Sequence, residues 1–209
     1  MSIMDDRYLI IGLTGRAGAG KDTAADVLCE AYQFYRFAFA DPVRAEIMRA
    51  FGVDMSIFST DTKERKMDAL AISRCVDIEF RTAVGKLGVS PQAPRSPREI
   101  MRWWGTEYRR AQNHRYWTNK AGDTLHEAMR RGFRRIVITD VRFKNEADFV
   151  RYHNGKLWEI RRATAESVPA SHQSEAEIAQ IEPDIVVENN KSMTAFAAAV
   201  MQAYRDSHG

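Results

Sequence analysis

Signals for membrane insertion and secretion are lacking in this chain. No apolar run approaches the roughly 20 residues that cross a bilayer, and the N-terminus has no charged region followed by an apolar signal core. The only two cysteines, Cys29 and Cys75, have the spacing of neither a metal site nor a redox motif. We therefore expect a soluble, cytoplasmic protein that has no membrane partner.

A strong net charge is also lacking, because 31 basic residues stand against 28 acidic ones and the formal net charge is only +3. An excess this small, without a basic tail, gives no reason to expect direct binding of nucleic acid. The positive charge is nevertheless concentrated in mid-chain, where two acids, Glu99 and Glu107, accompany eight basic residues: Arg81, Lys86, Arg95, Arg98, Arg102, Arg109, Arg110 and Arg115. An anionic ligand is expected in this region.

Short apolar runs alternate with stretches of helical periodicity, which predicts an α/β fold with a parallel sheet. Strands are predicted over 8–13, 35–39, 135–139, 157–160 and 185–187, and helices over 22–32, 116–131, 145–153, 174–181 and 192–204. Two further helices are predicted to begin at Asp41, as an N-cap before Pro42, and at Ser96, which forms a capping box with Glu99. One domain over 1–209 is expected, with a substrate-binding insert at about 53–97, where periodicity weakens.

A phosphate-binding loop follows the first predicted strand. Seven of the eight Walker A positions are matched, by Gly15, Arg16, Ala17, Gly18, Ala19, Gly20 and Lys21. The glycines let backbone N–H groups surround a phosphate, and Lys21 adds a mobile charge for the β- and γ-phosphates of ATP. A glycine-rich turn that only ends a strand is the alternative.

The eighth Walker A position is Asp22, where the pattern has a Ser or Thr that ligates magnesium. A carboxylate is an oxygen ligand that Mg²⁺ also accepts. We expect Asp22 to hold Mg²⁺, directly or through water, and Thr23 to contact the α-phosphate. ATP and Mg²⁺ are therefore the predicted cofactors.

Five segments together, GRAGAGKDT, FADPVR, SPREIMRWWGTEYRR, TDVRFKNE and SHQSE, resemble the phage deoxynucleoside monophosphate kinase family. The resemblance implies a P-loop fold with a parallel sheet of about five strands, a helical insert for the monophosphate and a lid. It also implies transfer of the γ-phosphoryl group of ATP to a deoxynucleoside monophosphate, in the host cytoplasm if the gene is a phage's. His172 and Glu175 are marked by the resemblance as lid or acceptor-side residues.

Phosphoryl transfer mainly requires that charge be neutralised and two anionic phosphates be aligned, so several arginines are expected. Arg44 lies one turn into its helix, where related kinases hold the acceptor phosphate, and Asp41 can accept a hydrogen bond from the sugar or base. Arg98, Arg102 and Arg109 are spaced by four and seven residues, which predicts one helical face. Arg98 is the first candidate for binding the acceptor phosphate. For Arg102 and Arg109 the alternative is a solvated basic face whose charges are paired with Glu107 and other acids.

Two further residues, Asp140 and Arg142, follow a predicted strand directly, at the sheet edge where α/β proteins bind ligands. Asp140 is expected to hold magnesium through water or to position the acceptor, and Arg142 to neutralise the transferring phosphoryl group. The alternative is that Asp140 pairs with Arg142 or caps the next helix. Asn189 follows the last strand and is placed to meet adenine or its ribose, although Asn-Asn is also a common turn.

The rival functions are a P-loop kinase for another phosphorylated acceptor, such as dephospho-coenzyme A or phosphomevalonate, and a nucleotide-dependent switch that acts on a partner. The near-neutral charge argues against a switch that binds nucleic acid. The sequence does not give the base preference or the oligomeric state, and a homodimer stays open.

Overall fold

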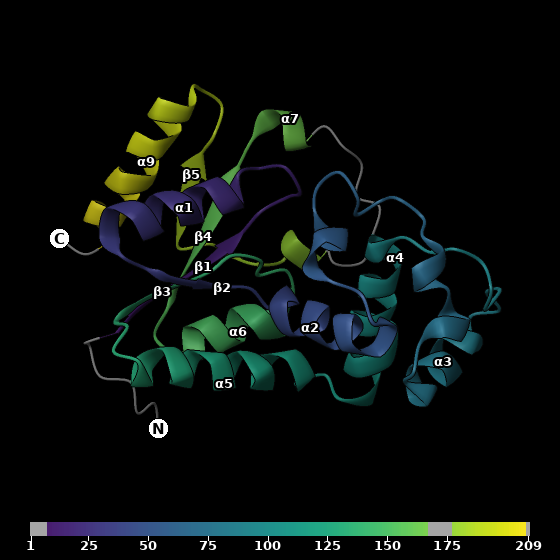
Figure 1. The fold of residues 1–209 in the computed structure, drawn as a ribbon. Coiled ribbons are helices and arrows are strands. Elements are labelled where there is room, and N and C mark those ends of the chain that lie inside the picture. Colours follow the sequence, from purple (N-terminus) through teal and green to yellow (C-terminus); the bar gives the residue numbers. More distant parts are fainter. Residues whose placement is uncertain (1–7, 167–176, 208–209) are drawn as a thin grey trace. The chain divides into compact units, whose positions relative to one another are not determined.

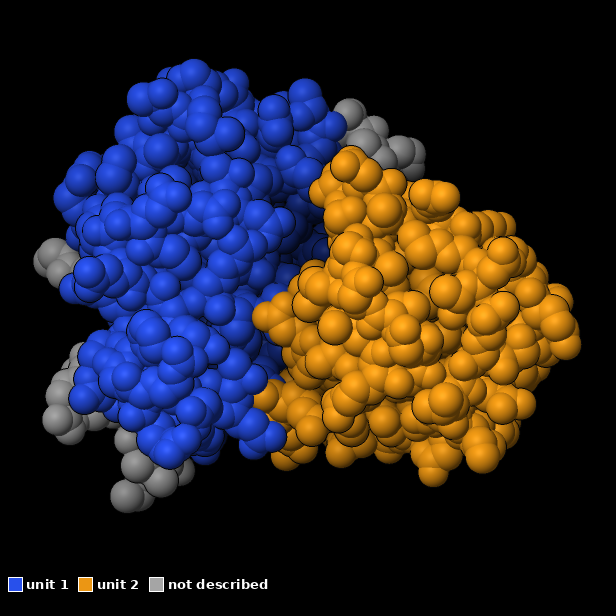
Figure 2. Space-filling view, in the orientation of Figure 1, with its two compact units in different colours: residues 1–39, 121–209 blue, residues 40–120 orange. Residues whose placement is uncertain are grey.

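A computed structural model of the chain describes residues 8–166 and 177–207. The chain divides into two compact units, which are coloured separately in Figure 2. Unit 1 is formed by Met1–Phe39 and Ala121–Gly209, and unit 2 by Ala40–Lys120. The segment 53–97, predicted as an insert, falls within unit 2.

Unit 1 contains a sheet of five parallel strands (Figure 1), which confirms the predicted fold class. The strands are β1 (Leu9–Thr14), β2 (Tyr35–Phe37), β3 (Arg135–Ile138), β4 (Lys156–Arg161) and β5 (Ile185–Glu188). Their order is β2-β3-β1-β4-β5, so β1 is the central strand. The loop after β1 therefore emerges between the carboxyl ends of two neighbouring strands.

Helices cover both faces of this sheet (Figure 1). The helices with a part in unit 1 are α1 (Lys21–Tyr32), α5 (Tyr116–Arg130), α6 (Lys144–Tyr152), α7 (Ala163–Glu166) and α9 (Met193–Asp206). On one face Ile11 and Leu13 pack with residues of α1 and α9. On the other face Ile10 packs with residues of α5 and α6. Because successive strand residues point to opposite faces, a continuous apolar run is what a strand between two helical layers requires.

Unit 2 is helical. Its elements are α2 (Ala40–Phe51), η1 (Met55–Phe58), η2 (Asp68–Leu70), η3 (Ile72–Arg74), α3 (Ile78–Gly85), α4 (Pro97–Arg102), η4 (Trp103–Arg110) and the first residues of α5. The core is aromatic, since the ring of Phe80 lies 4.5 Å from that of Trp104 and 5.7 Å from that of Tyr108. Ser96 and Glu99 form the predicted capping box at the start of α4.

Two local predictions in unit 2 are wrong. The helix α2 begins at Ala40, so Asp41 lies inside the first turn instead of capping it, and its carboxylate pairs with Arg44. The helix after Ser96 does not stay α-helical, because Trp103–Arg110 is a π-helix. Its wider turns, closed by i→i+5 hydrogen bonds, change which residues share a face.

Candidate active site

The predicted phosphate-binding loop leaves β1 in a conformation that only glycine adopts without strain. Gly15 has φ of 126°, and a Cβ there would lie 2.3 Å from the carbonyl oxygen of Ile160 on β4. Gly18 and Gly20 also have positive φ, 79° and 106°. The three glycines therefore let the backbone turn tightly against the sheet edge, the geometry that points N–H groups at an anion.

Asn189, just after β5, fastens the far end of the loop. Its side-chain amide donates to the carbonyl oxygen of Ala19 at 2.8 Å. A Cβ on Gly20 would lie only 2.4 Å from the Asn189 amide nitrogen. The residue predicted to meet adenine or ribose is thus in direct contact with the loop backbone.

Lys21 begins α1 and folds back over the loop. Its ammonium group donates to the carbonyl oxygens of Gly15 at 2.7 Å and Arg16 at 2.9 Å. Burial, together with the positive charge of Arg142, lowers the pKa of Lys21 from 10.5 to about 8, although Asp22 and Asp140 act in the opposite direction. A partly buried cation beside a second cation favours an anionic ligand, because a phosphate stabilises both.

Asp140 and Arg142 follow β3 on the loop that leads to α6. The backbone N–H of Phe39 donates to the Asp140 carboxylate at 2.7 Å, which connects the ends of β2 and β3. The buried carboxylate of Glu146 accepts from the backbone N–H groups of Arg142 at 2.9 Å and Phe143 at 3.2 Å. The structure thus brings Lys21, Asp140 and Arg142 near one another in unit 1 and fixes the backbone that carries Arg142.

Asp22 lies on the first turn of α1 with its side chain 81% exposed and paired with Arg36 of β2. Thr23, the next residue, is half-buried. In the described part of the chain no three His, Cys, Asp or Glu side chains gather into a metal-binding group. Mg²⁺ needs fewer, since it usually takes one or two carboxylates together with phosphate oxygens and water. The carboxylates of Asp22 and Asp140, both close enough to affect the pKa of Lys21, fit that requirement.

The arginines predicted to hold the acceptor lie in unit 2, and each pairs with an acid. Arg44 contacts Asp41 at 2.8 Å, Arg98 contacts Glu64, and Arg102 contacts Glu107 at 3.8 Å. The prediction that Arg109 shares their helical face is wrong, because it lies on the π-helix η4, from which it reaches Glu46 on α2 at 3.0 Å. The side chains of Arg98 and Arg102 are 54% and 44% exposed, whereas that of Arg109 is 20% exposed.

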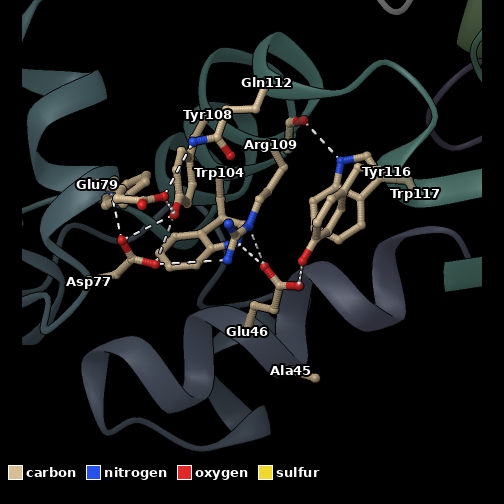
Figure 3. Close-up of polar contacts among 12 residues, drawn as sticks. Ala45, Glu46, Asp77, Glu79, Trp104, Tyr108, Arg109, Gln112, Tyr116 and Trp117 are labelled. Atoms are coloured by element: carbon tan, nitrogen blue, oxygen red, sulfur yellow. Dashed lines mark hydrogen bonds and ion pairs between the residues drawn. The ribbon is translucent and has the colours of Figure 1, made fainter. Parts of the chain in front are cut away.

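Around Arg109 unit 2 forms a polar cluster, which Figure 3 shows. The carboxylate of Glu46 accepts from Trp104 Nε1 at 2.8 Å, Arg109 Nε at 3.0 Å and the Tyr116 hydroxyl at 2.5 Å. Burial and the hydrogen bond to Glu46 raise the pKa of Tyr116 to about 12. These groups, with Asp77 and others, line a cavity of about 480 Å³.

Sequence reasoning missed Glu46, although the sequence holds a signal for it. The buried residues along α2 are Val43, Glu46, Ile47, Ala50 and Phe51, so the acid sits at a core-facing position of the helical period. An acid at such a position predicts a buried basic or hydroxyl partner. His172 and Glu175, which the family resemblance marks as lid or acceptor-side residues, lie outside the described residues.

A parallel sheet with a glycine-rich loop after its central strand and a lysine folded over that loop defines the P-loop nucleotide-binding fold. In fold the chain is similar to the dephospho-CoA kinase of Campylobacter jejuni, with a TM-score of 0.50 and 13% identity over 95% of this chain and 96% of that one. TT1252 of Thermus thermophilus is similar too, with a TM-score of 0.50 and 16% identity over 98% and 100% of the two chains.

Sequence comparison gives the family. The profile of the family "Deoxynucleotide monophosphate kinase" matches residues 75–200. A protein of Acanthamoeba polyphaga mimivirus, named provisionally as a deoxynucleotide monophosphate kinase, is 28% identical over 204 residues, which cover 92% of this chain and 94% of that protein. The chain belongs to the deoxynucleotide monophosphate kinase family and is a phosphotransferase, as the sequence motifs predicted.

No helix among residues 8–166 and 177–207 is long and apolar enough to span a bilayer.

Proposed function

We propose that the enzyme transfers the γ-phosphoryl group of ATP to a deoxynucleoside monophosphate, giving the deoxynucleoside diphosphate and ADP. The observation that supports this most directly is the partly buried Lys21 cation beside Arg142 at the end of a glycine-rich loop. Family membership supports a deoxynucleotide as the acceptor.

In this proposal the loop amides and Lys21 bind the β- and γ-phosphates, and Thr23 contacts the α-phosphate. Mg²⁺ would be held by Asp22 or Asp140 and would neutralise charge on the phosphates. Asn189 keeps the loop in its binding conformation through Ala19 and lies beside Gly20, where the nucleoside of ATP would approach. No protein group needs to remove a proton from the acceptor, because the acceptor phosphate oxygen is already ionised at neutral pH.

Arg142 is proposed to stabilise the charge that develops on the transferring phosphoryl group. The hydrogen bonds that the Glu146 carboxylate accepts from the backbone N–H groups of Arg142 and Phe143 position the backbone of this arginine before the reaction. A preorganised cation costs little reorganisation when charge moves in the transition state.

Arg44, Arg98 and Arg102 of unit 2 are proposed to bind the acceptor phosphate, with Asp41 and Glu175 on the acceptor side. The exposed pairs Arg98–Glu64 and Arg102–Glu107 can exchange an acid for a phosphate at small cost, since exposed ion pairs contribute little. Arg109 is assigned no acceptor role, because it is bound to Glu46.

The test is a coupled ADP-release assay with MgATP and, in separate wells, dTMP, dGMP, dCMP, dAMP, GMP and dephospho-coenzyme A. Strong stimulation by one or more deoxynucleotides is expected. Stimulation by dephospho-coenzyme A alone, or turnover that no acceptor changes, would replace the proposed function by one of its rivals.

Matched variants test the residues. Arg98→Ala is expected to lower turnover on the order of 10³-fold, whereas Glu64→Gln, which breaks the same ion pair but keeps the arginine, retains activity. Arg130→Gln is the general control, since that side chain is 78% exposed and pairs with Glu127 one turn away. Equal losses in Arg98→Ala and Glu64→Gln would mean that the ion pair, not phosphate binding, matters.

A further inference from the structure

Asp22 places a negative charge where the Walker A pattern has a neutral hydroxyl. Its neighbour Lys21 binds phosphate in the proposed function, and the charge of Asp22 is felt at Lys21. A carboxylate at this place repels a triphosphate as long as no cation offsets it. When no Mg²⁺ is bound, the loop therefore needs a compensating positive charge from the protein, which the Walker A pattern does not specify.

Arg36 supplies a cation at that place from β2, an edge strand of the sheet. Its guanidinium contacts the carboxylate of Asp22 through one terminal nitrogen and that of Asp26, at 2.5 Å, through the other. Asp22 and Asp26 are four residues apart on α1 and therefore lie on one helical face. One arginine thus holds both acids, and its own side chain is 34% exposed.

We propose that Arg36 is a positioning residue for the nucleotide site: it draws the Asp22 carboxylate toward β2 and offsets its charge, so that an acid at the eighth loop position is compatible with ATP. This inference rests on the proposed binding of ATP at the loop. Arg36 acts through Asp22 and does not itself touch the nucleotide.

The planar guanidinium is suited to this task. It donates from two nitrogens in a fixed fork and so can hold two carboxylates at once, whereas a lysine ammonium is a point charge on a flexible stem. Arg36→Lys is therefore expected to preserve the charge and to restore most of the function, but to hold Asp22 less firmly.

The experiment is a double-mutant cycle on ATP binding, measured by calorimetry in EDTA so that no metal masks the charge of Asp22. The proteins are the wild type, Arg36→Gln, Asp22→Asn and the double variant. Arg36→Gln is expected to weaken ATP binding about fivefold, the effect of one uncompensated charge in near-aqueous surroundings. In the Asp22→Asn background the same substitution is expected to change affinity less than about twofold, because no charge is left to offset.

Two controls keep the result specific. Asp26→Asn removes the other partner of Arg36 and is expected to leave ATP affinity unchanged, while Arg36→Lys recovers most of it. Thermal melts of each protein identify a folding defect, and if Arg36→Gln is unfolded, Arg36→Met, which also removes the charge, and its Asp22→Asn double take its place in the cycle.

The outcomes are distinct. Equal affinity of the wild type and Arg36→Gln, or an equal loss in both backgrounds, overturns the inference while the proposed function stands. If the folded wild type does not bind ATP, the proposed function fails, and this inference fails with it.

Discussion

Lys21 gives the sharpest quantitative prediction, because its pKa of about 8 lies within the range of an ordinary binding experiment. Phosphate binding requires the ammonium form. With a pKa of about 8, about nine tenths of the protein carries this cation at pH 7 and about one tenth at pH 9. A bound phosphate raises the pKa, so ATP binding takes up a proton on part of the protein.

The sign and size of the change in ATP affinity with pH follow from this linkage. The pKa in the free protein is below that in the complex, so affinity is greatest below pH 8 and falls as the pH rises above it. The dissociation constant for ATP is expected to increase about tenfold between pH 7 and pH 9, the ratio of the two cationic fractions. Calorimetry or intrinsic tryptophan fluorescence at half-unit pH steps measures it.

Lys21→Arg is the matched control, because a guanidinium stays protonated throughout this range. Its affinity for ATP is expected to be independent of pH from 7 to 9, whatever its absolute value. A flat profile for the wild type, or the same fall in Lys21→Arg, would refute the assignment of the titrating group.

Three further predictions concern the loop, the polar cluster and the second cation. In a urea titration, Gly15→Ala is expected to lower the free energy of unfolding by about 3 kcal/mol or more, because its Cβ meets a backbone oxygen. Gly18→Ala, which has open space around its Cβ, is expected to lower the free energy of unfolding by only about 1–2 kcal/mol. Tyr116→Phe removes the hydroxyl bonded to Glu46 and should cost about 2 kcal/mol, and a melting curve equal to that of the wild type would contradict the described hydrogen bond. Arg142→Gln removes a charge that lowers the pKa of the loop lysine, so the pH at which ATP affinity falls should move upward; an unchanged midpoint would show that the two cations do not interact.

The sequence predicted those features that depend on neighbouring residues. The apolar run before Gly15, the glycine spacing of the loop and the box of Ser96 with Glu99 are local patterns, and the strands, the loop and the start of α4 confirm them. The five strands and their parallel arrangement followed from the alternation of apolar runs and helical periods.

The features that were missed depend on contacts distant in sequence. Glu46 meets Trp104 and Tyr116, which lie 58 and 70 residues further along the chain, and no local pattern pairs them. The π-helix was not predicted either, because an α-helical period was assumed through Arg109. No local pattern marked Arg36 within its short predicted strand, because its partners belong to the preceding helix.

The contact of Asn189 with Ala19 has a consequence for the order in which the enzyme is made. The two residues are 170 positions apart, and the loop precedes nearly all of the chain whereas its fastener is among the last segments to be synthesised. Since chains emerge from the ribosome N-terminus first, a nascent chain carries the glycine-rich loop long before the amide that secures it. The hydrogen bond to Ala19 can therefore form only after Asn189, which follows all five strands of the sheet, has been synthesised.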